Sequence, residues 1–185
     1  MKVRGDFVTN SSSSSFILAF KNKRDAYAEA CIAFMKMKDY ERQEDEKYRD
    51  EDDDEEYERG FSFDDHACAL DNVLLAMEDG KINADEAIKR YLDSVSWYPV
   101  RHRIYERMWN DEENYPRESA DDFKAKYGEE IERLREEELI KLKQELEEWL
   151  KNKKYITYVS FEDHWPEGQA NSVCNHINKD NSRKL

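Results

Sequence analysis

Apolar residues at the two ends of the chain follow the pattern of short β-strands. Residues 16–20 (FILAF) form a nearly continuous apolar run of aromatic and aliphatic side chains, which is typical of a buried strand. Residues 155–161 (YITYVSF) alternate between two faces, which predicts a strand with one face in the core. Residues 2–8, where Val3 and Phe7 share a face, are a third candidate strand.

Between these ends the apolar spacing changes to the period of an α-helix. A first helix is expected over residues 24–40. Its apolar stripe consists of Ala26, Ala30, Ala33, Met37 and Tyr40, and Tyr27, Cys31 and Phe34 widen it. The same periodicity predicts four more helices, at about residues 62–79, 83–95, 99–109 and 119–152.

Turn and cap residues agree with these boundaries. Gly80 is a suitable stop for the second helix. Asn83, followed three residues later by Glu86, is a capping box at the start of the third.

The elements together predict an α+β fold that is mostly helical. A small sheet is built from the chain termini, with strands near 16–20 and 155–161 and 2–8 as an optional third, and about five helices cover it. A chain of 185 residues fits a single domain, 1–185. Two segments lack apolar periodicity: 41–59 is expected to be an acidic loop or helix extension, and 163–185 an irregular tail.

Acidic charge is concentrated in one of these segments. The formal net charge is −14 at pH 7, and residues 41–59 hold twelve acidic and four basic residues, a net charge of −8. Such a surface repels nucleic-acid phosphates and anionic lipids, and it suits a basic protein partner or simple solubility. The candidate partner-binding residues are Glu44, Asp45, Glu46, Asp50, Glu51, Asp52, Asp53, Asp54, Glu55, Glu56 and Glu58.

The cysteines and the lengths of the apolar runs bear on the cellular compartment of the protein. Cys31, Cys68 and Cys174 are odd in number, far apart and never in a CxxC pair, which favours reduced thiols over disulfides. No apolar run approaches the roughly 18 residues of a membrane span, and the start of the chain lacks a secretory apolar region. We therefore expect a cytoplasmic protein without membrane contact.

Polar residues after the last predicted strand follow the order found in HNH-type nucleases. Asp163-His164 is followed by Asn171 and then by His176. In that interpretation His164 is the general base, while Asp163 and His176 hold the metal ion. The spacing is compressed and no helical pattern follows, so a polar loop is the simpler interpretation, with no metal or cofactor expected.

Residues 98–107 (YPVRHRIYER) are basic and contain interleaved aromatic side chains. Such a stretch can bind phosphate or RNA by charge and stacking. Pairing with the chain's own carboxylates explains the same residues, so direct nucleic-acid binding is not expected.

The serine run near the start of the chain has three interpretations. It is a turn between strands 2–8 and 16–20, a solvated segment open to phosphorylation, or a tag read by another protein. The candidate modification or recognition residues are Asn10, Ser11, Ser12, Ser13, Ser14 and Ser15.

The opening MKVRGDFVTNSSSSSFIL resembles an amino-terminal signature, D-F-V-T-N-S-S-S-S-S-F, that heads many otherwise dissimilar bacterial and phage-borne proteins. The resemblance covers about residues 1–20 and implies a bacterial or mobile-element origin. The function of that group is unknown, so the resemblance implies no activity for any residue.

Three functional hypotheses follow. The first is a non-enzymatic interaction protein with a basic partner, in one form a phage-type inhibitor that presents carboxylates where a nucleic-acid-binding protein expects phosphates. The second is a metal-dependent nuclease or hydrolase that uses His164, Asp163 and His176. The third is a carrier of a modified or recognised poly-serine segment. The composition favours the first, and an enzyme is the alternative.

Overall fold

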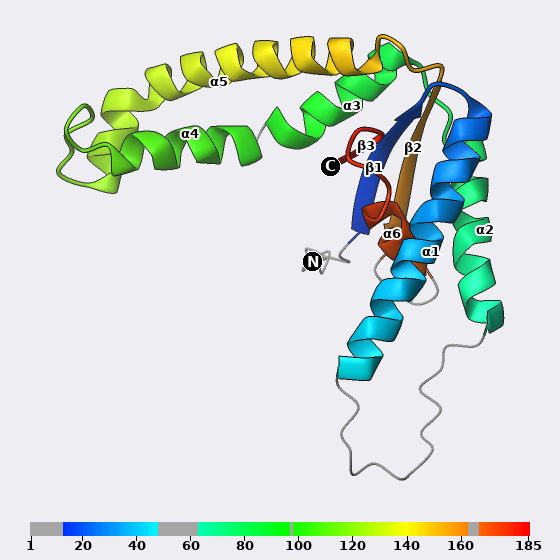
Figure 1. Ribbon diagram of the computed structural model, residues 1–185. Coiled ribbons are helices and arrows are strands. Elements are labelled where there is room, and N and C mark those ends of the chain that lie inside the picture. The colour runs from blue at the N-terminus through cyan, green and yellow to red at the C-terminus, as the bar shows by residue number, and fades with distance from the viewer. Residues whose placement is uncertain (1–12, 48–62, 97, 163–166) are drawn as a thin grey trace, which may run out of the picture. The chain divides into compact units, whose positions relative to one another are not determined.

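The computed structural model of the chain describes residues 13–47, 63–96, 98–162 and 167–185 (Figure 1). Its contacts divide the chain into two compact units: residues 1–82 with 153–184, and residues 83–152 with Leu185. The first unit holds the sheet and three helices, and the second holds three further helices, so the mostly helical α+β class is confirmed. The single domain over 1–185 stays a prediction.

The sheet of the first unit is antiparallel and joins the two ends of the chain. β1 (Ser13–Phe20) lies in the centre, with β2 (Tyr155–Glu162) on one side and the short β3 (Ser182–Lys184) on the other. Phe16 lies opposite Val159 in the β1–β2 register. The strands predicted at 16–20 and 155–161 are therefore confirmed as neighbours, while the candidate strand at 2–8 lies outside the described residues.

Three helices, α1 (Lys23–Lys47), α2 (Phe63–Asp79) and α6 (Glu167–Asn175), pack on one face of this sheet (Figure 1). Alternate residues of the strands point into their common core, as the period of two requires. Four residues of the predicted α1 stripe, Ala26, Ala30, Ala33 and Met37, are buried there, whereas Tyr40 and Cys31 are exposed, because they lie beyond or beside the part of the helix that meets the sheet. The core cluster consists of Phe16, Leu18, Phe20, Ala26, Ala30, Ala33, Met37, Ala69, Val73, Met77, Tyr155, Val159, Phe161, Ala170, Val173, Cys174 and Ile177.

In the second unit, α3 (Ala84–Ser96) and α4 (Pro99–Asn110) pack one after the other along the long helix α5 (Ala120–Leu150) (Figure 1). The Ser119 side chain caps α5 by accepting from the backbone N–H of Asp122 at 3.1 Å. Asn83 caps α3 in the same way, at 2.8 Å from the backbone N–H of Glu86, as its sequence predicted. Among the described helices, none is long and apolar enough to cross a membrane.

The structure corrects three boundaries. β1 begins at Ser13, because its pairing with β2 continues to the end of that strand, and the polar serines gave no apolar pattern that could show this. Helix α1 runs on to Lys47, so the acidic segment begins as a helix extension. The tail expected to be irregular over 163–185 contains α6 and β3, because buried Ala170 and Val173 anchor a helix that is otherwise polar.

Gly80 has a second role besides ending α2. The segment after α2 runs along the outer edge of β2, where the Gly80 carbonyl accepts from the backbone N–H of Tyr158 at 2.8 Å. A Cβ at residue 80 would lie only 1.9 Å from the carbonyl oxygen of Tyr158 and 2.8 Å from that of Ala76. Both neighbours are backbone atoms, so they cannot move aside without disturbing the strand or the helix.

Gly80→Ala is therefore expected to lower the free energy of unfolding by about 2 kcal/mol or more, since the added methyl group meets rigid backbone. Urea denaturation followed by circular dichroism measures this change. The matched control is Gly128→Ala in α5, where nothing lies within 4 Å of the new methyl group, and where alanine should stabilise the helix by about 0.5–1 kcal/mol. Equal effects of the two substitutions would contradict the close approach at Gly80.

Candidate functional site

The described part of the serine run belongs to the sheet. Ser14 is buried opposite Phe161, and the Ser15 hydroxyl donates to the hydroxyl of Ser160 at 2.9 Å. Tyr158 in turn donates to the Ser15 hydroxyl at 3.1 Å. Ser13, Ser14 and Ser15 thus belong to strand β1. Ser14 is buried, so a modifying enzyme would reach its hydroxyl only if this end of the strand opened, whereas Ser15 is half-buried. The remaining candidates of the run, Asn10, Ser11 and Ser12, lie outside the described residues.

The acidic candidates are only partly described. Glu44, Asp45 and Glu46 lie in the last turns of α1. The others, Asp50, Glu51, Asp52, Asp53, Asp54, Glu55, Glu56 and Glu58, lie outside the described residues. Helix α1 has already left the core at this point, because none of its residues from Lys38 to Gln43 is buried.

His176, the described member of the suggested nuclease site, directly follows α6. Its ring Nδ1 lies 2.9 Å from the carbonyl oxygen of Ser172, and because a carbonyl only accepts, Nδ1 carries the proton. The ring also lies 6.0 Å from that of Tyr40, centroid to centroid. Asp163 and His164 are outside the described residues, so their meeting with His176 stays a prediction. Within the described ranges, no group of three or more His, Cys, Asp or Glu side chains could hold a metal ion.

The basic stretch over 98–107 makes contacts within the second unit. Arg101 donates from Nε to Glu132 at 2.7 Å, and the other oxygen of Glu132 lies 2.8 Å from Nε of Arg135. The guanidinium of Arg101 holds the pKa of the Glu132 carboxyl below its ordinary value of 4.5. Internal pairing, the simpler of the two interpretations, is therefore confirmed for Arg101.

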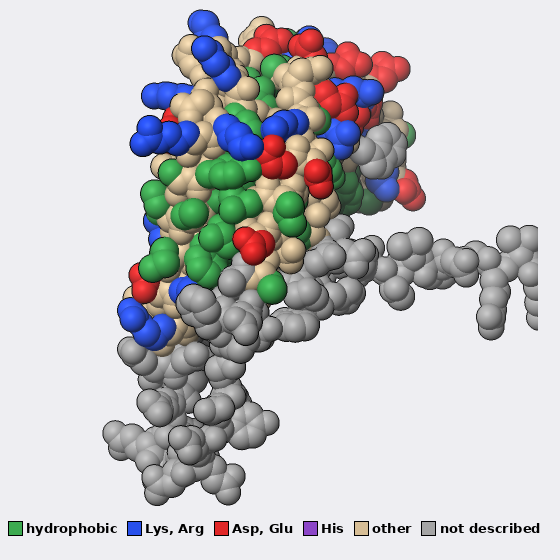
Figure 2. Space-filling view, turned by 90° about the vertical axis from the view of Figure 1, so that its right-hand side faces the viewer, with side chains coloured by type: hydrophobic (Ala, Val, Ile, Leu, Met, Phe, Trp, Pro, Cys, Tyr) green, Lys and Arg blue, Asp and Glu red, His purple; other side chains and the backbone are tan. Residues whose placement is uncertain are grey.

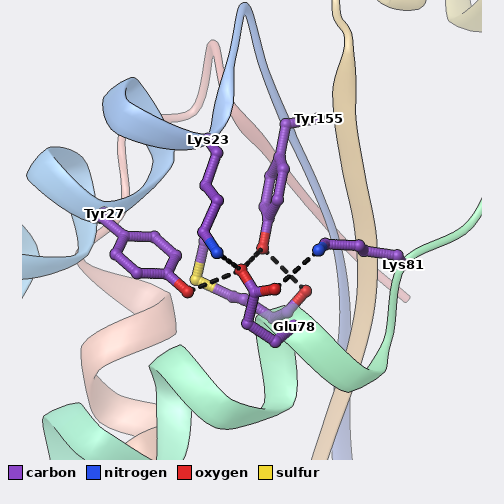
Figure 3. Close-up of polar contacts among 6 residues, drawn as sticks. Lys23, Tyr27, Glu78, Lys81 and Tyr155 are labelled. Carbon is purple, nitrogen blue, oxygen red and sulfur yellow. Dashed lines mark hydrogen bonds and ion pairs between the residues drawn. The ribbon is translucent and has the colours of Figure 1, made fainter.

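The densest polar cluster of the described residues surrounds one carboxylate, that of Glu78 (Figure 3). Glu78 lies in the last turn of α2. Lys23 and Tyr27 reach it from the first turns of α1, Tyr155 from the start of β2, and Lys81 from the segment after α2. We call these five residues the Glu78 cluster.

The geometry of the Glu78 cluster satisfies both carboxylate oxygens. Oε1 accepts from the Tyr27 hydroxyl at 2.6 Å and lies 2.7 Å from Nζ of Lys23. Lys81 donates from Nζ to Oε2 at 2.6 Å. The Tyr155 hydroxyl is 3.1 Å from Oε1 and 3.0 Å from the carbonyl oxygen of Met77, so its single proton is shared between them. The cluster thereby ties α1, α2 and β2 together.

Aromatic rings complete the cluster. The ammonium group of Lys23 lies 5.0 Å from the centroid of the Tyr27 ring, and that of Lys81 lies 5.5 Å from the Tyr155 centroid. A cation near the face of an aromatic ring is attracted by the ring quadrupole. Each tyrosine therefore holds a lysine by its ring and the carboxylate by its hydroxyl.

The electrostatics of the Glu78 cluster favour a structural role. Hydrogen bonds from Lys23, Lys81 and Tyr27 hold the pKa of Glu78 far below its ordinary value of 4.5. Burial, together with the hydrogen bond to Glu78, raises the pKa of Tyr155 well above 10.0. The hydrogen bond to Glu78 also raises the pKa of Lys23. A general acid or base needs a pKa near the working pH, and each of these shifts moves the pKa of its group further from 7.

Sequence reasoning missed this cluster. The glutamate and its tyrosine partners are 51 and 77 positions apart, and no local spacing links them. The one short-range signal is Glu78 followed three residues later by Lys81, which is common on helices and carries little information.

Glu78→Gln is expected to lower stability at neutral pH, because glutamine carries no negative charge to pair with the ammonium groups of Lys23 and Lys81. The native pKa of Glu78 is depressed, so its contribution is complete above about pH 4.5 and is lost as the pH falls below that value. The difference in unfolding free energy between wild type and variant should therefore shrink from pH 7 towards acid, as measured by urea denaturation at each pH. A difference that stays constant with pH would show that the charge is irrelevant.

Tyr155→Phe provides a milder test of the same cluster. It removes one buried hydroxyl and should cost about 1 kcal/mol. The matched control for Glu78→Gln is Glu136→Gln, at an exposed glutamate of α5, which should leave stability within about 0.5 kcal/mol of wild type.

The three cysteines should differ in reactivity towards a thiol reagent. Cys31 and Cys68 are exposed, whereas Cys174 is buried, and burial raises the pKa of its thiol to about 12. Because the thiolate is the reacting species, two thiols should react quickly with Ellman's reagent, and the third should react only when α6 detaches or the protein unfolds. Three equally fast thiols would contradict the packing of α6.

Comparisons with known proteins give no relative for this chain. No protein-family model, curated protein or solved structure matches it. The features that bear on function are therefore those of the chain itself: its acidic segment, the serines of β1 and the outer surfaces of its helices.

Proposed function

We propose that this chain is a non-enzymatic interaction protein that binds a basic protein partner through the carboxylates of residues 44–58. The observation that carries the proposal is the charge distribution. Residues 41–59 hold a net charge of −8, more than half of the chain's −14, within about a tenth of its length. Charge gathered in this way produces a strong local potential, which attracts a partner of opposite sign and speeds its approach.

The described end of α1 supports this proposal. Met37 is buried, none of the residues from Lys38 to Gln43 is, and α1 continues to Lys47. The backbone thus stays helical for ten residues beyond Met37, and these residues include Glu44, Asp45 and Glu46. The acidic segment thus starts on a regular helix.

In its sharper form, the partner is a nucleic-acid-binding protein. Such proteins carry Lys and Arg side chains placed to contact phosphates, and closely spaced carboxylates can occupy the same positions. The resemblance of the amino terminus to phage-borne proteins is consistent with an inhibitor that acts in this way.

The first test is an affinity pull-down with the full chain at low and at high salt. A basic partner should be retained at low salt and lost at high salt, because salt screens exposed charges. Changing Asp53, Asp54, Glu55 and Glu56 to their amides should reduce retention about ten-fold or more.

The matched control changes the same number of carboxylates elsewhere. Glu112, Glu113, Glu129 and Glu136 are exposed residues of the second unit, and their replacement by Gln alters the net charge equally. Retention should survive in this control. Equal loss in both variants would mean that net charge alone matters, and the absence of any retained partner would refute the proposal.

A further inference from the structure

Basic side chains gather at one end of the first unit, where β1 ends and α1 begins. Residues 21–25, 153–154 and 178–184 meet there, and they hold eight basic and two acidic residues, a net charge of +6. The rest of the chain therefore carries −20 of the total of −14. Figure 2, which looks onto α1 and α2, shows Lys and Arg side chains towards the end at which α1 begins, and hydrophobic side chains further along.

Hydrogen bonds hold the three segments together. The backbone N–H of Lys154 donates to the carbonyl oxygen of Phe20 at 2.9 Å. The ammonium group of Lys153 donates to the carbonyl oxygen of Asp180 at 3.1 Å and to Oδ1 of Asn181 at 2.7 Å. The turn after β1, the residues before β2 and the residues that lead into β3 thus share one end of the sheet. We define the basic end as Lys21, Arg24, Lys153, Lys154 and Lys179.

The positive charges at the basic end act on one another. Burial lowers the pKa of Lys153 below its ordinary value of 10.5, the carboxylate of Asp180 opposes this shift, and the charges of Lys21 and Arg183 add to it. Like charges held this close repel each other, so binding of an anion relieves the repulsion.

Most cations of the basic end lack an acidic partner within the chain. The exposed members form no ion pair with any described residue, and they are Lys21, Arg24, Lys154 and Lys179. In the second unit, by contrast, Arg101, Arg133 and Arg135 all pair with glutamates. An acidic chain that leaves several neighbouring cations unpaired has a surface that can receive an external anion.

Two of the acidic side chains at this end bond to neutral groups. Asp25 accepts from the side-chain amide of Asn22 at 3.0 Å, and Glu29 accepts from the backbone N–H of Asn178 at 3.0 Å. Neither forms an ion pair with a residue that the structure describes, so the basic end keeps its excess of positive charge.

The acidic segment of the same copy is too far away to neutralise the basic end. Helix α1 has 25 residues and is therefore about 37 Å long. It ends, and the antiparallel helix α2 begins, at the opposite end of the unit (Figure 1). Residues 48–62 join these two helix ends, and a chain of that length anchored at both ends extends at most about 27 Å from them.

We propose that the basic end binds the carboxylates of residues 44–58 of a second copy of the chain, so that copies associate head to tail. Charge complementarity selects this occupant, because residues 41–59 carry a net charge of −8. Each pair of copies leaves one basic end and one acidic segment free, so the association continues to larger oligomers or closes into a ring. The inference does not require the basic partner of the proposed function, which would compete for the same carboxylates.

Other anions fit the basic end less well. A nucleic acid or an anionic membrane extends beyond it and would meet the remaining residues of the chain, whose net charge of −20 repels phosphates. A short acidic peptide segment can contact the basic end alone.

The test is sedimentation velocity of the purified full chain over a range of concentrations. At low salt the average sedimentation coefficient should rise with concentration, and at high salt it should fall to that of a monomer, because salt screens exposed charges. Lys21→Gln with Lys154→Gln and Lys179→Gln should weaken the association about ten-fold or more.

The matched control changes the same number of lysines in the second unit. Lys89, Lys124 and Lys141 are exposed, and their replacement by Gln alters the net charge equally. Association should survive in this control. All six lysines have exposed side chains, so circular dichroism should report intact folds.

Mixing two defective variants gives the sharper test. The second variant changes Asp53, Asp54, Glu55 and Glu56 to their amides and keeps its basic end. Each variant alone should be monomeric. An equimolar mixture should form a dimer and nothing larger, because each variant contributes one working surface.

Three results would overturn the inference: a monomer at low salt at every concentration, an equal loss of association in the lysine control, or a mixture that stays monomeric. An oligonucleotide that binds the unmodified chain and is released by the triple lysine substitution, without self-association, would assign the basic end to nucleic acid and would also refute it. None of these results decides the pull-down with a basic partner, which tests the proposed function separately.

Discussion

The antiparallel pairing of β1 with β2 is the constraint on which the first unit depends. It joins segments as distant as Ser15 and Ser160, 145 positions apart in the chain. The entropic cost of closing such a loop grows only slowly with the number of residues in it, so strands this far apart in the chain can still pair. Once paired, the two strands present an apolar face with Phe16, Leu18 and Phe20, and α1, α2 and α6 cover that face.

The Glu78 cluster secures this arrangement at one end. The carboxylate receives groups from α1, from β2 and from the segment that follows α2, so the three elements meet at one point. Gly80 lies two residues further on, where the backbone approaches β2 too closely for any side chain. The hydrogen bonds of Glu78 and the close packing of the Gly80 backbone against β2 thus fall in the same short stretch, residues 78–82, and together they hold α2 against the strand.

The surface of the first unit has more apolar and acidic character than folding requires. The core accounts for the buried stripe of α1, but not for Ile32 and Met35 on its other side or for the extension of the helix to Lys47. The acidic segment that joins α1 to α2 is the basis of our proposal that the chain binds a basic protein partner. The serines of β1, by contrast, are explained by the sheet itself, since Ser14 is buried and Ser15 is hydrogen-bonded within it.

The amino-acid sequence by itself determined helices α1 to α5, the two main strands and the acidic segment. Each of these is local, since the period of the apolar residues sets the element and a cap such as Asn83 sets its end. Tertiary structure alone decided that Ser13–Ser15 continue β1, because serines join a strand only when a partner strand pairs with them. It also decided that the polar residues of α6 form a helix and that Glu78 meets Tyr155. Both depend on contacts between residues far apart in the chain, and no periodicity or spacing in the sequence encodes such contacts.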